Sequence, residues 1–217
     1  MMRTDEEIRD DVLAEIDWEP QIESTEVGVT VKNGAVTLTG TVSSYSEKLA
    51  AERAAKRVKG VYAIAEEMKV KYPSDKSVTD DEIAERIASI IEWNTSIPRE
   101  TVKAEVRDGF VTLTGEVDWN YQREVARNQI ANVRGVTAVS NLINVKPRVA
   151  ESDVSKEINR ALHRNADLEA SHVQIDVKGG KVTLNGNVKA WYERKLVEDA
   201  VWAAPGVTQV VDNLRVA

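Results

Sequence analysis

The strongest constraint on the fold is an internal repeat, because one short phrase occurs three times along the chain. Each copy has glycine as its second residue, then a Val-Thr-Leu triplet and a closing glycine, at residues 33–40, 108–115 and 179–186. A second glycine, followed by valine, stands 26 residues after the first in every copy: Gly34 and Gly60, Gly109 and Gly135, Gly180 and Gly206. Such self-similarity predicts a tandem array of one small domain.

Each unit opens with a segment that predicts an amphipathic helix. Ile8, Val12 and Ile16 recur at a spacing of four residues, which places them on one helical face. Thr4 with Glu7 has the spacing of a capping box at the start of this helix. The same features recur in the later copies, at Ile83, Ile87, Ile91, Thr79 and Glu82, and at Val154, Ile158 and Leu162, where Ser152 has no matching glutamate.

A β-hairpin follows the helix in every unit. Asn33-Gly34 tolerates the positive φ angles of a type I′ turn, as do Asp108-Gly109 and Gly179-Gly180. A two-residue turn places only apolar residues opposite one another, as a hairpin with one buried face requires. The predicted pairs are Val31 with Val36, Val29 with Leu38, Val106 with Val111, Ala104 with Leu113, Val177 with Val182, and Ile175 with Leu184.

A second helix and a last strand complete the unit. The helices are predicted near residues 46–59, 121–134 and 192–204, and Gly60, Gly135 and Gly206 are predicted to stop them. The inner face of the first of these helices is small, with Ala51, Ala54, Ala55 and Val58. The last strand is predicted around Ile64, Met68 and Val70, then Val139, Ile143 and Val145, then Val210, Leu214 and Val216.

The element order αββαβ predicts the α+β class, as three tandem two-layer sandwiches of two helices on a three-stranded mixed sheet. We expect domains at residues 1–72, 78–147 and 151–217, which we call the first, second and third repeat. Residues 72–78 and 146–151 contain Pro73 and Pro147 and are the predicted linkers. They are too short to let neighbouring domains move independently.

Composition restricts the partners of the chain. The net charge of −7 opposes generic binding to nucleic acid or anionic lipid, which needs clustered Lys and Arg. The balance is −5 over residues 4–72, −3 over 79–147 and zero over 152–217, so the repeats do not present identical surfaces. The absence of Cys excludes disulfides and thiolate metal sites. With no secretory signal or membrane-spanning run visible, we expect a soluble cytoplasmic protein, with the periplasm as the alternative.

The repeated pattern resembles the BON domain family. The hairpin at residues 109–115 and the closing segment at residues 206–216 match that family best, and three such units cover nearly the whole chain. The resemblance implies a role like that of osmotic-stress-induced periplasmic proteins and envelope proteins, which are proposed to bind phospholipid. Three units instead of two, and no visible signal peptide, depart from the osmotically induced periplasmic type and make a cytoplasmic, membrane-peripheral role an equal alternative.

No motif in the sequence indicates catalysis or cofactor binding. The turn glycines do not precede a helix or a Lys-Ser/Thr pair, so no phosphate loop is present, and no nucleophile elbow occurs. His163 and His172 occur only in the third repeat and are interpreted as isolated surface residues rather than metal ligands. No unit has the G-x-x-G loop of KH-like RNA modules. We therefore expect no enzyme activity, no cofactor and no nucleic-acid partner.

Aromatic residues provide the candidate binding site. They cluster between the second strand and the second helix, beside a basic residue: Tyr45 with Lys48, Trp119 and Tyr121 with Arg123, and Trp191 and Tyr192 with Arg194. Such rings favour a lipid headgroup interface or anchor a protein partner; alternatively they cap the small cores or pack between units. Trp18, Trp93 and Trp202 are interpreted as packing residues. The expected function is a non-enzymatic module for a phospholipid surface in stress, or a protein scaffold that uses aromatic loops or sheet edges; the oligomeric state stays open.

Overall fold

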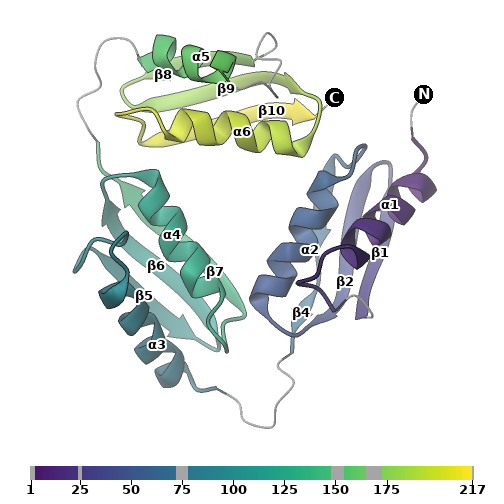
Figure 1. Cartoon of the computed structure of the whole chain (residues 1–217), viewed down its shortest axis with the longest axis horizontal. Coiled ribbons are helices and arrows are strands. Elements are labelled where there is room, and N and C mark those ends of the chain that lie inside the picture. Colours follow the sequence, from purple (N-terminus) through teal and green to yellow (C-terminus); the bar gives the residue numbers. More distant parts are fainter. Residues whose placement is uncertain (1–2, 24–25, 72–77, 148–153, 165–172, 217) are drawn as a thin grey trace. The chain divides into compact units, whose positions relative to one another are not determined.

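The computed structural model describes residues 3–23, 26–71, 78–147, 154–164 and 173–216, and within them each repeat forms two helices and one sheet (Figure 1). The first repeat contains α1 (Asp5–Asp17), β1 (Val27–Lys32), β2 (Ala35–Val42), α2 (Tyr45–Arg57), β3 (Ala63–Glu66) and β4 (Lys69–Val70). The second contains α3 (Asp80–Trp93), β5 (Val102–Arg107), β6 (Phe110–Val117), α4 (Asn120–Ala131) and β7 (Ala138–Val145). The third contains α5 (Val154–Arg164), β8 (Val173–Lys178), β9 (Lys181–Val188), α6 (Trp191–Trp202) and β10 (Gln209–Val216).

Each repeat builds a separate mixed sheet, which confirms the predicted α+β class. The second strand of the repeat is central: it pairs antiparallel with the first strand and lies beside the last, to which it runs parallel in the first and third repeats. The sheet of the first repeat has four strands rather than the expected three, because its last strand is divided into β3 and β4, which both pair with β2. The two helices of a repeat lie on one face of its sheet (Figure 1).

The hairpin register agrees with the sequence in all three repeats. All six predicted apolar pairs lie opposite one another, from Val31 and Val36 in the first repeat to Ile175 and Leu184 in the third. Both turn residues have positive φ, with values of 50° and 73° at Asn33 and Gly34, which is the I′ geometry. The alternation leaves Val36, Leu38, Val182 and Leu184 fully buried against the helices.

The first helix binds the hairpin turn directly. The carboxylate of Asp5, the first residue of α1, accepts the backbone N–H of Asn33 at 2.8 Å and of Gly34 at 2.9 Å. Asp80 repeats this contact in the second repeat, to Asp108 at 2.7 Å and Gly109 at 2.9 Å. The capping boxes of α1 and α3 form as expected, with Thr4 and Glu7 in the first and Thr79 and Glu82 in the second.

The constant 26-residue glycine spacing has a packing explanation. A Cβ on Gly34 would lie 2.7 Å from the carbonyl oxygen of Gly60, and a Cβ on Gly109 would lie 2.5 Å from that of Gly135. The two backbones therefore touch where the last strand begins. The prediction that Gly60, Gly135 and Gly206 stop the second helix was wrong in detail. Those helices end at Arg57, Ala131 and Trp202, and the glycines lie in the turn beyond them.

The cores follow the predicted helix stripes. Ile8, Val12 and Ile16 are buried, as are Ile83 and Ile87 in the second repeat, whereas Ile91 is half-buried. Val154 and Ile158 are buried in the third, and the side chain of Leu162 lies outside the described residues. The small alanine face of α2 is buried as expected, which lets that helix approach its sheet closely.

Candidate functional site

The predicted aromatic loops are exposed only in part. Tyr121 and Tyr192 are 57% and 51% exposed near the start of α4 and α6, and Trp119 and Trp191 are half-buried. Tyr45 departs from the expectation, because it is only 8% exposed and belongs to the core of the first repeat. It is the first residue of α2 rather than a loop residue, since Ser44 takes the N-cap position. Tyr45 therefore offers no accessible ring to a partner.

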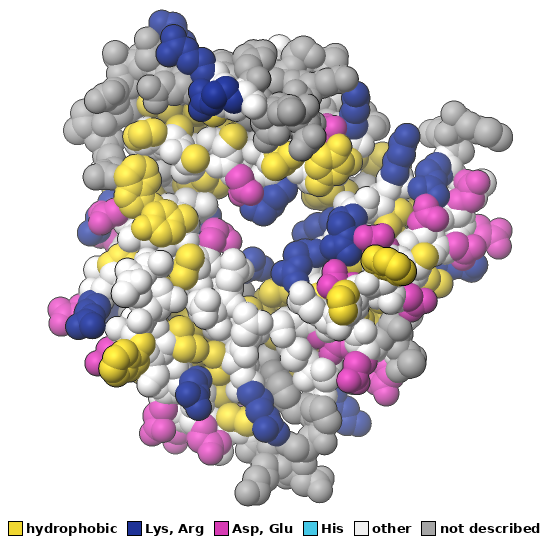
Figure 2. Space-filling view, in the orientation of Figure 1, with side chains coloured by type: hydrophobic (Ala, Val, Ile, Leu, Met, Phe, Trp, Pro, Cys, Tyr) yellow, Lys and Arg dark blue, Asp and Glu magenta, His cyan; other side chains and the backbone are white. Residues whose placement is uncertain are grey.

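The basic residues beside these aromatic residues lie within the second helices and contact their own repeat. Lys and Arg side chains gather over α2 (Figure 2), yet Lys48 Nζ lies 2.7 Å from a Glu66 carboxylate oxygen and donates to the Met68 carbonyl at 2.8 Å. Arg194 forms the equivalent pair with Asp212 in the third repeat, and its guanidinium lies 5.0 Å from the Trp191 ring centroid. These contacts fix the second helix to the last strand.

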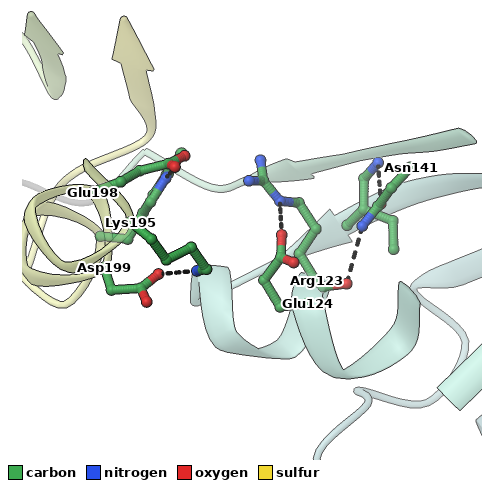
Figure 3. Close-up of polar contacts among 8 residues, drawn as sticks. Arg123, Glu124, Asn141, Lys195, Glu198 and Asp199 are labelled. Carbon is green, nitrogen blue, oxygen red and sulfur yellow. Dashed lines mark hydrogen bonds and ion pairs between the residues drawn. The ribbon is translucent and has the colours of Figure 1, made fainter. Parts of the chain in front are cut away.

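The second repeat makes this connection differently. Asn141 occupies the position of Glu66 and Asp212, and its side-chain amide donates to the backbone carbonyl of Arg123 at 3.0 Å (Figure 3). The Arg123 guanidinium lies 3.6 Å from Glu124 on the same helix. In every repeat this last-strand side chain also accepts the N–H two residues later, at Met68, Ile143 and Leu214. This last-strand position therefore has a structural role in every repeat.

Two buried carboxylates, which the sequence analysis did not single out, have a similar structural role. Glu47 accepts the backbone N–H groups of Glu23 at 2.8 Å and Ser43 at 2.7 Å, so its charge is satisfied by the chain that surrounds it. Glu193, the equivalent residue of the third repeat, accepts the N–H of Lys189 at 2.7 Å. Alignment of the repeats could have identified them, since both immediately precede the basic residue in the first turn of the second helix.

Trp18 and Trp93 are exposed aromatic residues, so the expectation that they cap the cores of their own units was wrong, whereas packing between units stays a prediction. They are 85% and 81% exposed and occupy equivalent positions at the C-terminal ends of α1 and α3. Their exposure follows from helical geometry: both lie on the turn beyond the buried stripe, on a face that no strand covers. The third repeat has Arg164 at this position. Trp202 is half-buried and donates to Glu198 at 3.4 Å, as a packing residue would.

The surroundings of the two exposed tryptophans differ in charge. Arg57 of α2 lies 2.6 Å from Glu15 and 3.2 Å from Glu19, on either side of Trp18 in the sequence. The hydrogen bond to Glu15 raises the pKa of Arg57 above its ordinary value, so the guanidinium is charged throughout. Trp93 is flanked by Glu92 and Asn94 and follows the half-buried Ile90 by three residues. The site in the second repeat is thus the less acidic of the two.

The part of the chain that the structure describes supports neither a metal site nor a membrane-spanning helix. It contains no group of three or more His, Asp or Glu side chains arranged to hold a metal ion. None of the described helices is both long enough and apolar enough to cross a bilayer. His172 and the side chain of His163 lie outside the described residues.

Comparison with known proteins agrees with the repeat structure. The model of the BON domain matches residues 4–72, 79–147 and 150–217. The chain is 31% identical over 134 residues to osmotically-inducible protein Y of Escherichia coli, an alignment that covers 58% of this chain and 64% of that protein. It thus spans slightly less than two thirds of that relative.

Solved structures of CdsD, a structural protein of the type III secretion system of Chlamydia trachomatis, are also similar. One is 15% identical, with a TM-score of 0.27, and the comparison covers 97% of this chain and 92% of that one. Another, of the C-terminal domain, is 16% identical, with a TM-score of 0.26 and 96% coverage of both chains. Because the family model covers nearly the whole chain in three successive matches, this chain belongs to the BON domain family.

Proposed function

We propose that this chain is a non-catalytic module that binds a phospholipid membrane surface peripherally, in an osmotic or general stress response. The observation that carries the proposal is the exposure of Trp18 and Trp93, at 85% and 81%. A large apolar ring held in water contributes little to the stability of its own domain. Its contribution comes when a partner removes it from water.

Tryptophan suits a membrane surface in particular. The indole ring is flat and largely apolar but has one N–H donor, so it favours the headgroup zone between water and acyl chains. Tyr121 and Tyr192, which are exposed at the second helices, have the same amphipathic character and are further candidate contacts in the second and third repeats. The stress context is supported by the similarity to an osmotically inducible protein.

The charges beside the tryptophans indicate which surface is favoured. Glu15, Asp17 and Glu19 accompany Trp18, and Arg57, which pairs with Glu15 and Glu19, offsets only one of these three charges. The whole chain has a net charge of −7. Like charges would repel an anionic bilayer, and salt would screen that repulsion. We therefore expect binding to zwitterionic vesicles to exceed binding to anionic vesicles, and binding to anionic vesicles to increase with added salt.

The proposal is tested by co-sedimentation of the full chain with phosphatidylcholine vesicles, with Trp fluorescence read in the same samples. The wild-type chain is expected to pellet with vesicles and to show a blue-shifted emission. The double variant W18A/W93A is expected to lose at least ten-fold in affinity, because both exposed indoles are gone. Phe110→Ser is the matched control, since it removes an exposed aromatic ring from the sheet of the second repeat.

Either of two results would contradict the proposal. Binding that is the same in W18A/W93A as in the wild-type chain would remove the role of the two tryptophans. An equal loss in Phe110→Ser would show that the vesicles respond to general apolar exposure. Circular dichroism of all three proteins checks that each remains folded.

A protein scaffold is the second candidate, because one open sheet face bears apolar side chains. Phe110 on β6 and Leu142 on β7 are both exposed, while Val111 and Ile143 next to them point into the core. The two exposed residues therefore lie on the face without helices. A scaffold would associate with its partner in the absence of vesicles, and that association would be lost in F110S/L142S rather than in W18A/W93A.

A further inference from the structure

The third repeat has a groove between its two helices. It has a volume of about 310 Å³, and its floor is formed by small apolar side chains from α5 and α6. Two basic side chains of α5 stand beside them. The lining residues are Ile158, Ala161, Ala200, Ala203, Ala204 and Pro205, with Arg160 and Arg164.

Comparison of the repeats shows why the groove is found here. In the first repeat the side chains of Glu15 and Arg57 meet between the helices at 2.6 Å. The residues at these two positions of the third repeat are Ala161 and Ala203, which cannot reach across. Two long charged side chains are thus replaced by two methyl groups, and the space between the helices stays open.

The charges of the groove are also specific to the third repeat. Arg160 and Arg164 are four residues apart, so they project from the same side of α5, and both are exposed. The equivalent residues are Ala14 and Trp18 in the first repeat and Ser89 and Trp93 in the second. None of the described residues that line the groove is acidic, and within that part of the chain neither arginine forms an ion pair. An apolar trough with two guanidinium groups on one side suits an anionic amphiphile.

We propose that this groove binds one molecule of a single-chain amphiphile whose headgroup is an oxyanion, such as a fatty acid. The alkyl chain lies on the alanine floor between α5 and α6, and Arg160 and Arg164 bind the headgroup oxygens. Guanidinium groups match a carboxylate or phosphate because they offer paired N–H donors in a plane. A volume of about 310 Å³ is at the lower end of ligand pockets, which fits one alkyl chain rather than a two-chain phospholipid.

This site is distinct from the tryptophan site of the first two repeats, and the two can be tested separately. The probe is decanoate, titrated below its critical micelle concentration into the full chain at neutral pH, with binding followed by calorimetry. Saturable binding of one decanoate per chain is expected. Acetate, which has the headgroup alone, and decyl maltoside, which has the chain with a neutral head, are each expected to bind at least ten-fold more weakly.

Two variants test the two halves of the site. R160Q/R164Q removes the headgroup contacts, and Ala203→Leu fills the groove while it keeps both arginines; each is expected to weaken decanoate binding at least ten-fold. The matched control is K178Q/K181Q, which removes the same charge from the hairpin of the third repeat. Ala203 is exposed at the C-cap of α6 in helical geometry, so leucine is compatible with the fold there.

The possible results separate cleanly. An absence of saturable decanoate binding overturns the inference, even where the wild-type chain still binds vesicles through its tryptophans. An equal loss in K178Q/K181Q and R160Q/R164Q overturns it too, because the effect would then be general electrostatics. Acetate bound as tightly as decanoate would leave the groove without a role and would contradict the proposal.

Discussion

The two glycines of the hairpin turn in the third repeat differ in which substitutions the structure allows. Gly179 has a φ of 56° and no neighbour within 4 Å of a Cβ placed on it. Gly180 has a φ of 82°, and its Cβ would lie 2.8 Å from the carbonyl oxygen of Gly206. The first position requires only the left-handed conformation, which asparagine tolerates, whereas the second also requires the absence of a side chain.

We therefore predict opposite results for substitutions at adjacent residues. Gly180→Ala is expected to lower the free energy of unfolding by about 1–3 kcal/mol, because it adds backbone strain and forces two backbones apart. Gly179→Asn is expected to leave stability unchanged or to raise it by about 0.4–1 kcal/mol, because it restricts the unfolded chain. Urea denaturation of both variants measures the difference. Equal losses in the two would show that the glycine contact does not limit the turn.

At the scale of the element, α1 depends on its first turn. The Glu7 carboxylate accepts the Thr4 backbone N–H at 2.8 Å, and the Thr4 hydroxyl accepts the Glu7 N–H at 3.2 Å. The backbone hydrogen bond from Thr4 lowers the pKa of Glu7 below its ordinary value of 4.5. Because the folded pKa is the lower one, the stabilising contact is fully present above pH 4.5 and is lost as the pH falls through the folded pKa.

The lowered pKa of Glu7 gives a second prediction. NMR titration of the wild-type chain is expected to place the Glu7 pKa below 4.5, and Thr4→Ala is expected to move it back toward 4.5, because the hydroxyl no longer fixes the turn. A Glu7 pKa that does not change in Thr4→Ala would contradict a role of the capping box in holding the carboxylate.

The elements show which parts of the structure the sequence could predict. The hairpins were predicted to the residue because turn type and apolar alternation are local properties. The exposure of Trp18 and Trp93 was missed because a large apolar residue beside a buried stripe favours a packing interpretation. The charged Arg164 at the equivalent position was a signal that this position faces water. Tyr45 was misplaced by one residue, from the first turn of α2 into the loop before it.

Contacts between side chains of different elements could not be predicted from local sequence patterns. Lys48 and Glu66 are 18 residues apart, as are Arg194 and Asp212, and only the folded unit brings the second helix against the last strand. Comparison of the repeats nevertheless indicates the pairing. In the second repeat Asn141 replaces the acidic residue, and there the last strand contacts the helix through the backbone carbonyl of Arg123. The α5–α6 groove was not predictable either, because it arises from two distant alanines.

At the scale of the whole molecule, one fold is used three times with different surfaces. The first and second repeats expose a tryptophan at the end of the first helix, and the third has an arginine there beside an open groove. The charge balance also changes from −5 to −3 to zero along the chain. Repetition therefore gives the same frame three times, while the residues at the exposed end of the first helix differ between the repeats.

Two equivalent tryptophans on one chain raise the question of whether they act together. If one bilayer engages both at once, the second contact is intramolecular, and the combined affinity can exceed that of either site by about 10²–10⁴. If each site binds separately, removal of one lowers the apparent affinity only about two-fold, because the other remains complete. The single variants therefore distinguish the two modes, which the double variant cannot do.

We expect both tryptophans to engage at once, because the predicted linker at residues 72–78 is short and limits how far the first and second repeats can separate. Trp18→Ala and Trp93→Ala should then each weaken binding to phosphatidylcholine vesicles by more than ten-fold, with the larger loss for Trp93→Ala, because fewer acidic residues accompany that ring. A vesicle titration of each single variant, with Phe110→Ser as the control, measures the change. A two-fold loss in both would mean that the repeats bind one at a time, and the tandem arrangement would then raise the number of sites rather than their affinity.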